Sequence, residues 1–164
     1  MSAFWRRLSG DSTSAAVVLA LALCASPIAA QKTSLTVTGG TVAFPAPTAT
    51  DYIAGYIDAS TGATFTVNSL NGVPRTTTIS IRSTSASLGT GKVIGDLQWR
   101  RSDLATWNSI TLTDAQVEQR IVVNKALNDP WSNTIFFRML LSWTSDGPAT
   151  YSANYQITLS QTVP

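Results

Sequence analysis

The C-terminal part of the chain alternates between apolar and polar residues over a long run, and this pattern restricts the possible folds more than any other feature. In residues 149–160 every second position is apolar, and these positions are Tyr151, Ala153, Tyr155, Ile157 and Leu159. Successive side chains of a β-strand point to opposite faces, so the run predicts a strand that is buried on one face only.

A second alternating run, residues 135–143, precedes this strand. One phase is apolar and ends in Trp143, which we therefore expect in the core. The other phase carries Phe136, Arg138 and Leu140, so the strand is predicted to be central and covered on much of both sides. Ser-Asp-Gly-Pro at residues 145–148 separates the two runs. Asp-Gly between alternating segments is typical of a β-hairpin turn.

Earlier segments repeat the alternation over shorter lengths. They predict strands at residues 35–38, 41–44, 52–57, 63–69, 76–83, 96–101, 107–112 and 119–124. Clusters of Gly, Pro, Ser and Asn between them predict turns. Many short strands at this spacing predict an all-β fold, a single antiparallel β-sandwich, with a closed barrel as the alternative. A capping-box pattern at residues 113–116 predicts one or two helical turns that run to Glu118, which would then be solvated.

One pair of segments resembles a known family. Leu-Gln-Trp-Arg-Arg at residues 97–101, a short turn, and Trp-Asn-Ser-Ile at residues 107–110 resemble the central hairpin of immunoglobulin-like and fibronectin-III-like domains in secreted bacterial proteins. The two C-terminal runs resemble the last two strands of such domains. The resemblance covers roughly the second half of the chain, without a cysteine pair or a tyrosine-corner motif. It implies a β-sandwich and no particular activity, because these domains serve many functions.

Residues 1–30 have the three parts of a secretory signal peptide. Arg6 and Arg7 precede an apolar stretch at residues 15–23, and small residues lead to Ala30. We expect Sec-type export, cleavage after Ala30 and a single domain over residues 31–164, which is secreted or held at the cell surface. A signal anchor, or a lipid on Cys24, is the alternative. The apolar stretch is short for a membrane span, and no other segment is long and apolar enough, so no span is expected in the mature chain.

The residue types exclude much of enzyme chemistry. The chain has no histidine and one cysteine, Cys24. Ser-His-Asp and Cys-His catalysis, and metal sites made of imidazole or thiolate, are therefore impossible in the mature domain. The aspartates in predicted loops lack the spacing of a calcium-binding loop, and Glu118 is the only glutamate. We therefore expect no cofactor, no bound metal ion and no catalytic activity. A net charge of +2 without a basic cluster beyond residues 100–101 argues against a nucleic-acid partner.

Aromatic residues are the remaining candidates for binding. Trp131 lies in a polar segment with Asn128, Asp129 and Asn133. An indole ring flanked by amides and a carboxylate is suited to a sugar, whose apolar face stacks on the ring. Alternatively, Trp131 folds back to close one end of the sandwich. Three further aromatic residues are placed by their phase: Tyr52 and Tyr56 on a second exposed patch, and Trp107 on the outer face or at a sheet edge.

Two functions remain open from the sequence. The first is a non-enzymatic structural or adhesive surface component, which assembles with itself or another surface protein. Its assembly strand would be residues 32–38, which direct only Leu35 and Val37 toward a core and precede Gly39 and Gly40. The second is a small carbohydrate-binding module that binds a glycan through Trp131.

Overall fold

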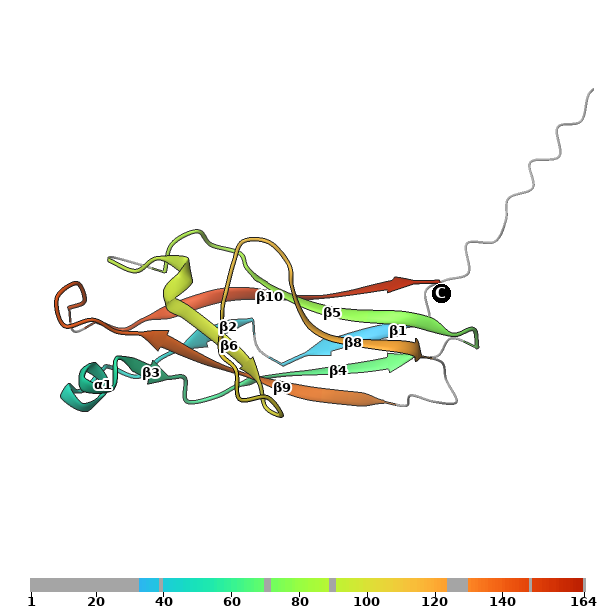
Figure 1. Ribbon diagram of the computed structural model, residues 1–164, viewed down its shortest axis with the longest axis horizontal. Coiled ribbons are helices and arrows are strands. Elements are labelled where there is room, and N and C mark those ends of the chain that lie inside the picture. The colour runs from blue at the N-terminus through green and yellow to red at the C-terminus, as the bar shows by residue number, and fades with distance from the viewer. Residues whose placement is uncertain are drawn as a thin grey trace, which may run out of the picture. The chain divides into compact units, whose positions relative to one another are not determined.

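Ten strands of the described chain pair into two antiparallel sheets (Figure 1). The computed structural model describes residues 33–38, 40–69, 72–88, 91–123, 130–147 and 149–163. Residues 1–30, where the signal peptide is predicted, lie outside the described residues, so its cleavage stays a prediction. The sheets do not close into a barrel in the described part of the chain, and the predicted all-β sandwich is confirmed.

The larger sheet has six strands and the smaller sheet has four. The larger sheet runs in the order β1 (Thr33–Val37), β4 (Ala63–Ser69), β9 (Trp131–Leu140), β6 (Leu97–Arg101) and β7 (Asn108–Ser109), and β3 (Tyr56–Asp58) also pairs with β9. The smaller sheet runs in the order β2 (Thr41–Ala43), β10 (Ser152–Thr162), β5 (Arg75–Ser83) and β8 (Ala115–Val123). A helix α1 (Ala49–Ala54) and a 3₁₀ turn (Ile94–Asp96) complete the described elements.

The core lies between the facing sheets and is built from alternate residues of their strands. Fully buried side chains come from both layers, among them Phe65, Leu97, Ile135, Phe137 and Met139 of the larger sheet and Ile79 and Ile81 of the smaller. Each strand therefore has an inner face, in contact with the other sheet, and an outer face, as expected for a sandwich.

The two C-terminal strands do not form the predicted hairpin. β9 belongs to the larger sheet and β10 to the smaller, so the chain crosses from one sheet to the other between Leu140 and Ser152. Their inner faces meet across the core, where the ring centroids of Phe137 and Tyr155 lie 4.9 Å apart. Each of these two long strands has one apolar face, and packing across the core lets the two faces cover each other. Side-by-side pairing in one sheet would not bring the apolar faces into contact.

The prediction that Trp143 belongs to the core is wrong. β9 ends at Leu140, so the alternation of faces stops three residues before the tryptophan. Trp143 is 61% exposed and stacks on Tyr52, with ring centroids 4.6 Å apart. Apolar residues continue at every second position of the sequence beyond the point where the backbone leaves the sheet.

The segment predicted as a strand at residues 52–57 is a helix followed by a short strand. Thr48 and Asp51 form a capping box, in which the Thr48 backbone N–H donates to Asp51 Oδ2 at 2.7 Å. Gly55, with φ of +77°, ends α1 in the left-handed conformation that glycine adopts without strain. Tyr52 is consequently buried on the helix and Tyr56 is exposed on β3, so the two do not form the predicted shared patch.

The helical turns predicted at residues 113–118 are absent, because residues 115–118 belong to β8, which begins at Ala115. Its backbone pairs with β5, with Ala115 opposite Ile81 and Gln116 opposite Ser80. Pairing with a long neighbouring strand outweighs the weak local preference of a capping sequence.

β3 and β4 both pair with β9, and the chain between them passes close to that strand. Asp58 lies opposite Arg138, and Ala63 lies opposite Ile135. A Cβ atom added at Gly62 would lie 2.7 Å from the Ile135 carbonyl oxygen. Glycine is required there because any side chain would collide with β9, and it lets β3 and β4 both pair with that strand.

Candidate functional site

Trp131 does not offer a ring to a ligand. It begins β9, is 6% exposed, and meets Phe65 edge to face with ring centroids 5.7 Å apart. The guanidinium of Arg120 lies 4.2 Å from the centroid of its ring. The tryptophan is therefore folded back against the sandwich, as in the alternative prediction. Two of its predicted site partners, Asn128 and Asp129, lie outside the described residues.

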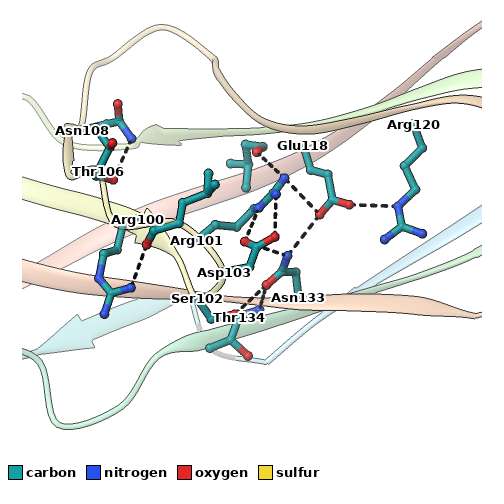
Figure 2. Close-up of polar contacts among 12 residues, drawn as sticks. Arg100, Arg101, Ser102, Asp103, Thr106, Asn108, Glu118, Arg120, Asn133 and Thr134 are labelled. Carbon is teal, nitrogen blue, oxygen red and sulfur yellow. Dashed lines mark hydrogen bonds and ion pairs between the residues drawn. The ribbon is translucent and has the colours of Figure 1, made fainter.

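Asn133 belongs to a polar network on the inner face, shown in Figure 2. Its side-chain oxygen accepts from the Ser102 hydroxyl at 2.8 Å. Its amide nitrogen donates to Glu118 Oε2 and to Asp103 Oδ1, both at 3.4 Å. The amide that we predicted as a sugar ligand is therefore engaged by the protein itself.

The network is organised around Arg101, which bridges the two sheets. Its Nε and Nη2 donate to the two oxygens of Asp103, each at 2.7 Å. Nη1 lies 3.5 Å from Glu118 Oε2 on β8, and Arg120 Nε lies 2.9 Å from Glu118 Oε1. Because β6 and β8 belong to different sheets, these contacts tie the sheets together along one side of the sandwich.

A bulge in β8 explains why the only glutamate of the chain points inward. Ile79 pairs with Glu118 and the next residue, Ser80, pairs with Gln116, so Val117 is an extra residue. Two neighbouring side chains, Val117 and Glu118, are therefore both buried. The expected solvated position of Glu118 is wrong, since strict alternation does not continue through a bulge.

The acidic and basic groups of this network stabilise one another in their charged forms. Hydrogen bonding from Arg101 lowers the pKa of Asp103, and the bond to Asp103 raises the pKa of Arg101. Both oxygens of Glu118 are occupied by protein donors. A catalytic carboxyl group needs a proton to donate or a free lone pair directed at a substrate. The arrangement is suited to cross-linking the sheets.

A second buried ion pair lies where the chain crosses after β9. The side chains of Lys92 and Asp146 are 3% and 1% exposed and contact each other directly. Lys92 Nζ also donates to the Leu140 carbonyl at 2.5 Å, and the Ser142 N–H donates to Asp146 at 2.6 Å. Burial raises the pKa of Asp146, but the hydrogen bonds from Lys92 and Ser142 and the charge of Lys92 outweigh it, so the pKa is lowered. The pair fastens two loops together.

Apart from Trp143, the accessible aromatic residues of the described chain lie on the outer face of the larger sheet. Tyr56 on β3 and Phe136 on β9 are each 37% exposed. Trp107, just before β7, is half-buried and contacts both Arg100 and Arg138. This agrees with the predicted position of Trp107 on an outer face. We refer to Tyr56, Arg138, Trp107, Arg100 and Phe136 as the outer-face cluster.

The predicted assembly strand forms the first strand of the larger sheet. Among the described strands β1 pairs only with β4, in a register that sets Leu35 opposite Val67 and Val37 opposite Phe65. Leu35 and Val37 are partly buried and pack against the rim of the core. β1 therefore has a single strand neighbour among the described strands, and two partly buried apolar side chains.

Comparisons with known proteins identify no relative. No protein-family model matches the chain, and neither a curated protein nor a solved structure is similar enough to count as a match. The immunoglobulin-like resemblance stays a prediction, and function has to be inferred from this chain's own residues.

Two features are absent from the part of the chain that the structure describes. No helix there has the length and apolar character needed to cross a membrane. No group of three or more His, Cys, Asp or Glu side chains in this part of the chain is placed to hold a metal ion.

The outer-face cluster was missed by sequence reasoning, although one signal for it was present. Phe136 and Arg138 occupy the phase of β9 opposite to the core residues, and Arg100 has the same position on β6. We interpreted this phase as a second covered face. The strand order and register that bring β3, β9 and β6 side by side could not be obtained from the alternation.

Proposed function

We propose that this protein is an exported, non-enzymatic structural or adhesive component of a cell surface, and that its subunits assemble by exchanging β1. The observation that carries the proposal is the position of β1 at the edge of the larger sheet, with one strand neighbour among the described strands. An edge strand presents unpaired backbone groups to another chain, and an N-terminal edge strand can leave its sheet without disturbing other elements.

The energetics of β1 are compatible with exchange. Full burial of a Leu or Val side chain is worth about 1.5–3 kcal/mol, so the partly buried Leu35 and Val37 contribute on the order of 3 kcal/mol together. This contribution is small enough to be lost transiently. In an exchanged pair the same contacts with β4 form again between two copies, so assembly restores them.

The link between β1 and β2 is a suitable hinge. β1 ends at Val37 and β2 begins at Thr41, yet they belong to different sheets. Gly40 has no neighbouring atom within 4 Å of an added Cβ, and its carbonyl accepts one hydrogen bond, from the Tyr155 N–H at 3.2 Å. A short connection between two sheets favours domain swapping over rearrangement of the whole sandwich, because only this connection has to change its path.

The absence of an enzymatic role is supported by residue chemistry. The sequence has no histidine, and its single cysteine lies in the predicted signal peptide. The most buried carboxylates, Glu118 and Asp146, are bound by arginine or lysine. These groups are committed to structural contacts.

The proposal is tested by deleting residues 31–38 and measuring particle mass by light scattering. The exported protein should form species larger than a monomer, and the truncated protein should remain a soluble β-rich monomer. A peptide of residues 31–38 should bind to the truncated protein, because it restores the missing neighbour of β4. If the intact and truncated proteins are both monomeric at high concentration, strand exchange is rejected.

Point variants on the same strand give a matched control. Leu35→Asn removes an inward side chain and should weaken assembly, whereas Thr36→Asn changes an exposed side chain of β1 and should leave assembly unchanged. Equal effects of the two variants would contradict an exchange that depends on the inner face of β1.

A carbohydrate-binding module is the second candidate. Trp131 is buried, so it does not favour this function, but Tyr56 and Phe136 provide exposed rings on the outer face. Glycan binding at a cell surface is compatible with an adhesive role and does not require assembly. Saturable quenching of tryptophan fluorescence by a glycan would distinguish this candidate from a purely structural one.

A further inference from the structure

The outer-face cluster is an alternating stack of aromatic rings and guanidinium groups. Arg138 lies between Tyr56 and Trp107, with its Cζ atom 5.0 Å and 4.4 Å from the two ring centroids. Arg100 lies between Trp107 and Phe136, at 5.1 Å and 5.0 Å. A guanidinium that is held over aromatic faces keeps its orientation and has its donor groups directed along the edges of the plane.

Strand pairing brings these side chains together. Arg100 on β6 is opposite Phe136 on β9, and Arg138 on β9 is opposite both Asp58 on β3 and Gln98 on β6. All of them belong to the outer phase of their strands, where neighbours across strands are close enough for side-chain contact. The cluster is therefore built on the rigid centre of the larger sheet.

The two arginines of the cluster have no acidic partner among the described residues. In this part of the chain their guanidinium nitrogens make two hydrogen bonds. Arg138 Nε donates to Gln98 Oε1 at 2.7 Å, and Arg100 Nη1 donates to the Leu104 carbonyl at 2.9 Å. Four other basic side chains are each paired with a carboxylate: Arg82, Lys92, Arg101 and Arg120. Two positive charges with unused donors are thus fixed side by side.

A hollow adjoins one of these charges, that of Arg100. It has a volume of about 200 Å³ and is lined by Asp58, Ala59, Arg100, Trp107, Phe136 and Phe137. A second hollow of about 420 Å³ shares Asp58 with the first, and Tyr56, Thr48 and Asp51 also line it. Two hollows with a common residue suit a chain of small rings better than one isolated small molecule.

From this geometry we infer that the outer-face cluster binds an acidic polysaccharide whose sugar rings carry carboxylate groups. The sugar carboxylates would accept from the free edges of Arg100 and Arg138, because a guanidinium matches the geometry of a carboxylate. The exposed parts of Tyr56 and Phe136 would contact the apolar face of a sugar ring. Asp58 would accept hydrogen bonds from hydroxyl groups.

The same features favour an acidic polysaccharide over two other ligands. A neutral glycan would leave two guanidinium charges without a partner. An acidic peptide would place its carboxylates near Asp58 without supplying hydroxyl donors for it. The inference rests on carbohydrate binding, the second candidate function, and is independent of strand exchange.

Calorimetric titration of the exported protein with an oligogalacturonide at low ionic strength tests the inference. We expect saturable binding that weakens as salt is added, and weaker binding of a neutral glucan of the same length. Arg100→Gln and Arg138→Gln should each reduce the affinity about tenfold, because each removes a charge-assisted pair of hydrogen bonds. Asp58→Asn should leave the affinity for the acidic oligosaccharide equal or higher, since a repelling charge is removed.

Arg82→Gln is the matched control. Arg82 is an exposed arginine on β5 of the smaller sheet, ion-paired with Asp114, and its replacement should not change binding. Circular dichroism melts confirm that all variants are folded. The protein lacking residues 31–38 should still bind, so loss of assembly and loss of sugar binding are separate results.

Three outcomes would overturn the inference. The first is the absence of binding to the oligogalacturonide. The second is equal affinity of the Arg100→Gln and Arg138→Gln variants and the unaltered protein. The third is binding of the neutral glucan or of poly-glutamate as tight as that of the oligogalacturonide.

Discussion

Arg100 and Arg101 are identical neighbours on β6, yet they face opposite environments. Arg101 points inward and binds Asp103 and Glu118, which links the two sheets. Arg100 points outward and lies between Trp107 and Phe136, without a carboxylate partner in the described chain. The inner arginine is neutralised and stabilises the fold, whereas the outer one keeps its charge for a ligand.

The same division holds for Phe136 and Phe137 on β9. Phe137 is 2% exposed and contacts Tyr155 in the core, while Phe136 covers the guanidinium of Arg100 on the surface. Chemical identity does not determine the role of a residue in this sandwich. The face of the strand determines it, because one face meets the other sheet and the other meets solvent.

The phenylalanine pair provides the largest expected difference. Phe137→Ala should lower the free energy of unfolding by about 3–5 kcal/mol, since it leaves a cavity in the core. Phe136→Ala should cost about 1 kcal/mol, the loss of partly exposed contacts with Arg100. Denaturant unfolding of the two variants measures the difference. Equal losses would contradict the assignment of faces on β9.

The buried Lys92–Asp146 pair tests whether buried charges stabilise this fold. Asp146→Asn removes the closer counter-charge of the buried Lys92 and leaves only Asp96, whose Oδ2 lies 3.9 Å from Nζ, so it should destabilise by about 3 kcal/mol at neutral pH. The folded pKa of Asp146 is below its ordinary value, so its contribution is complete above the unfolded pKa of about 3.9. That contribution is lost as the pH falls through the folded pKa.

The measurement is the free energy of unfolding against pH for both proteins. Hydrogen bonds from Thr48 lower the pKa of Asp51, and the bond from Arg101 lowers that of Asp103, so both proteins should lose stability in acid. The difference in free energy of unfolding between the two proteins should begin to narrow below about pH 4, where Asp146 becomes protonated in the unfolded state, and should be lost as the pH falls through its lower folded pKa. A gap that does not change with pH would show that the carboxylate charge is not what stabilises the loops.

Glu118 tests the inner network and has the smallest expected effect of the three. Glu118→Gln removes the charge shared by Arg101 and Arg120 and should cost about 2 kcal/mol, because the carboxylate is buried and the arginines are only partly so. Asp103→Asn is the control: its side chain is 52% exposed, so its ion pair is screened by solvent and the variant should lose less stability than Glu118→Gln. If the control variant unfolds as easily as Glu118→Gln, the link between the sheets does not depend on Glu118.

The strands with unbroken alternation were predictable from the sequence. The segment at residues 63–69 was predicted with the bounds that β4 has, and the inner phases of β9 and β10 were assigned correctly up to Leu140. The errors fall where alternation is interrupted. Trp143 follows the end of a strand, and Glu118 follows a bulge.

The candidate site was less predictable than the fold. Trp131 and Asn133 were chosen for their polar sequence neighbours, but the inner face of β9 turns both toward the protein. The outer-face cluster combines residues from β3, β6, β9 and the segment before β7. Contacts between segments so distant in the sequence leave no local pattern.

The sequence by itself determined the chemistry and the layers of this protein. Its composition excludes histidine and thiolate chemistry in residues 31–164, and its period-two pattern separates an apolar from a polar face on most strands. Only the tertiary structure decided which faces meet. Strand order, register and the bulge in β8 place Arg101 beside Glu118 and Arg100 beside Trp107. Pairing depends on long-range backbone hydrogen bonds and on packing between sheets, and many pairings satisfy the same alternation.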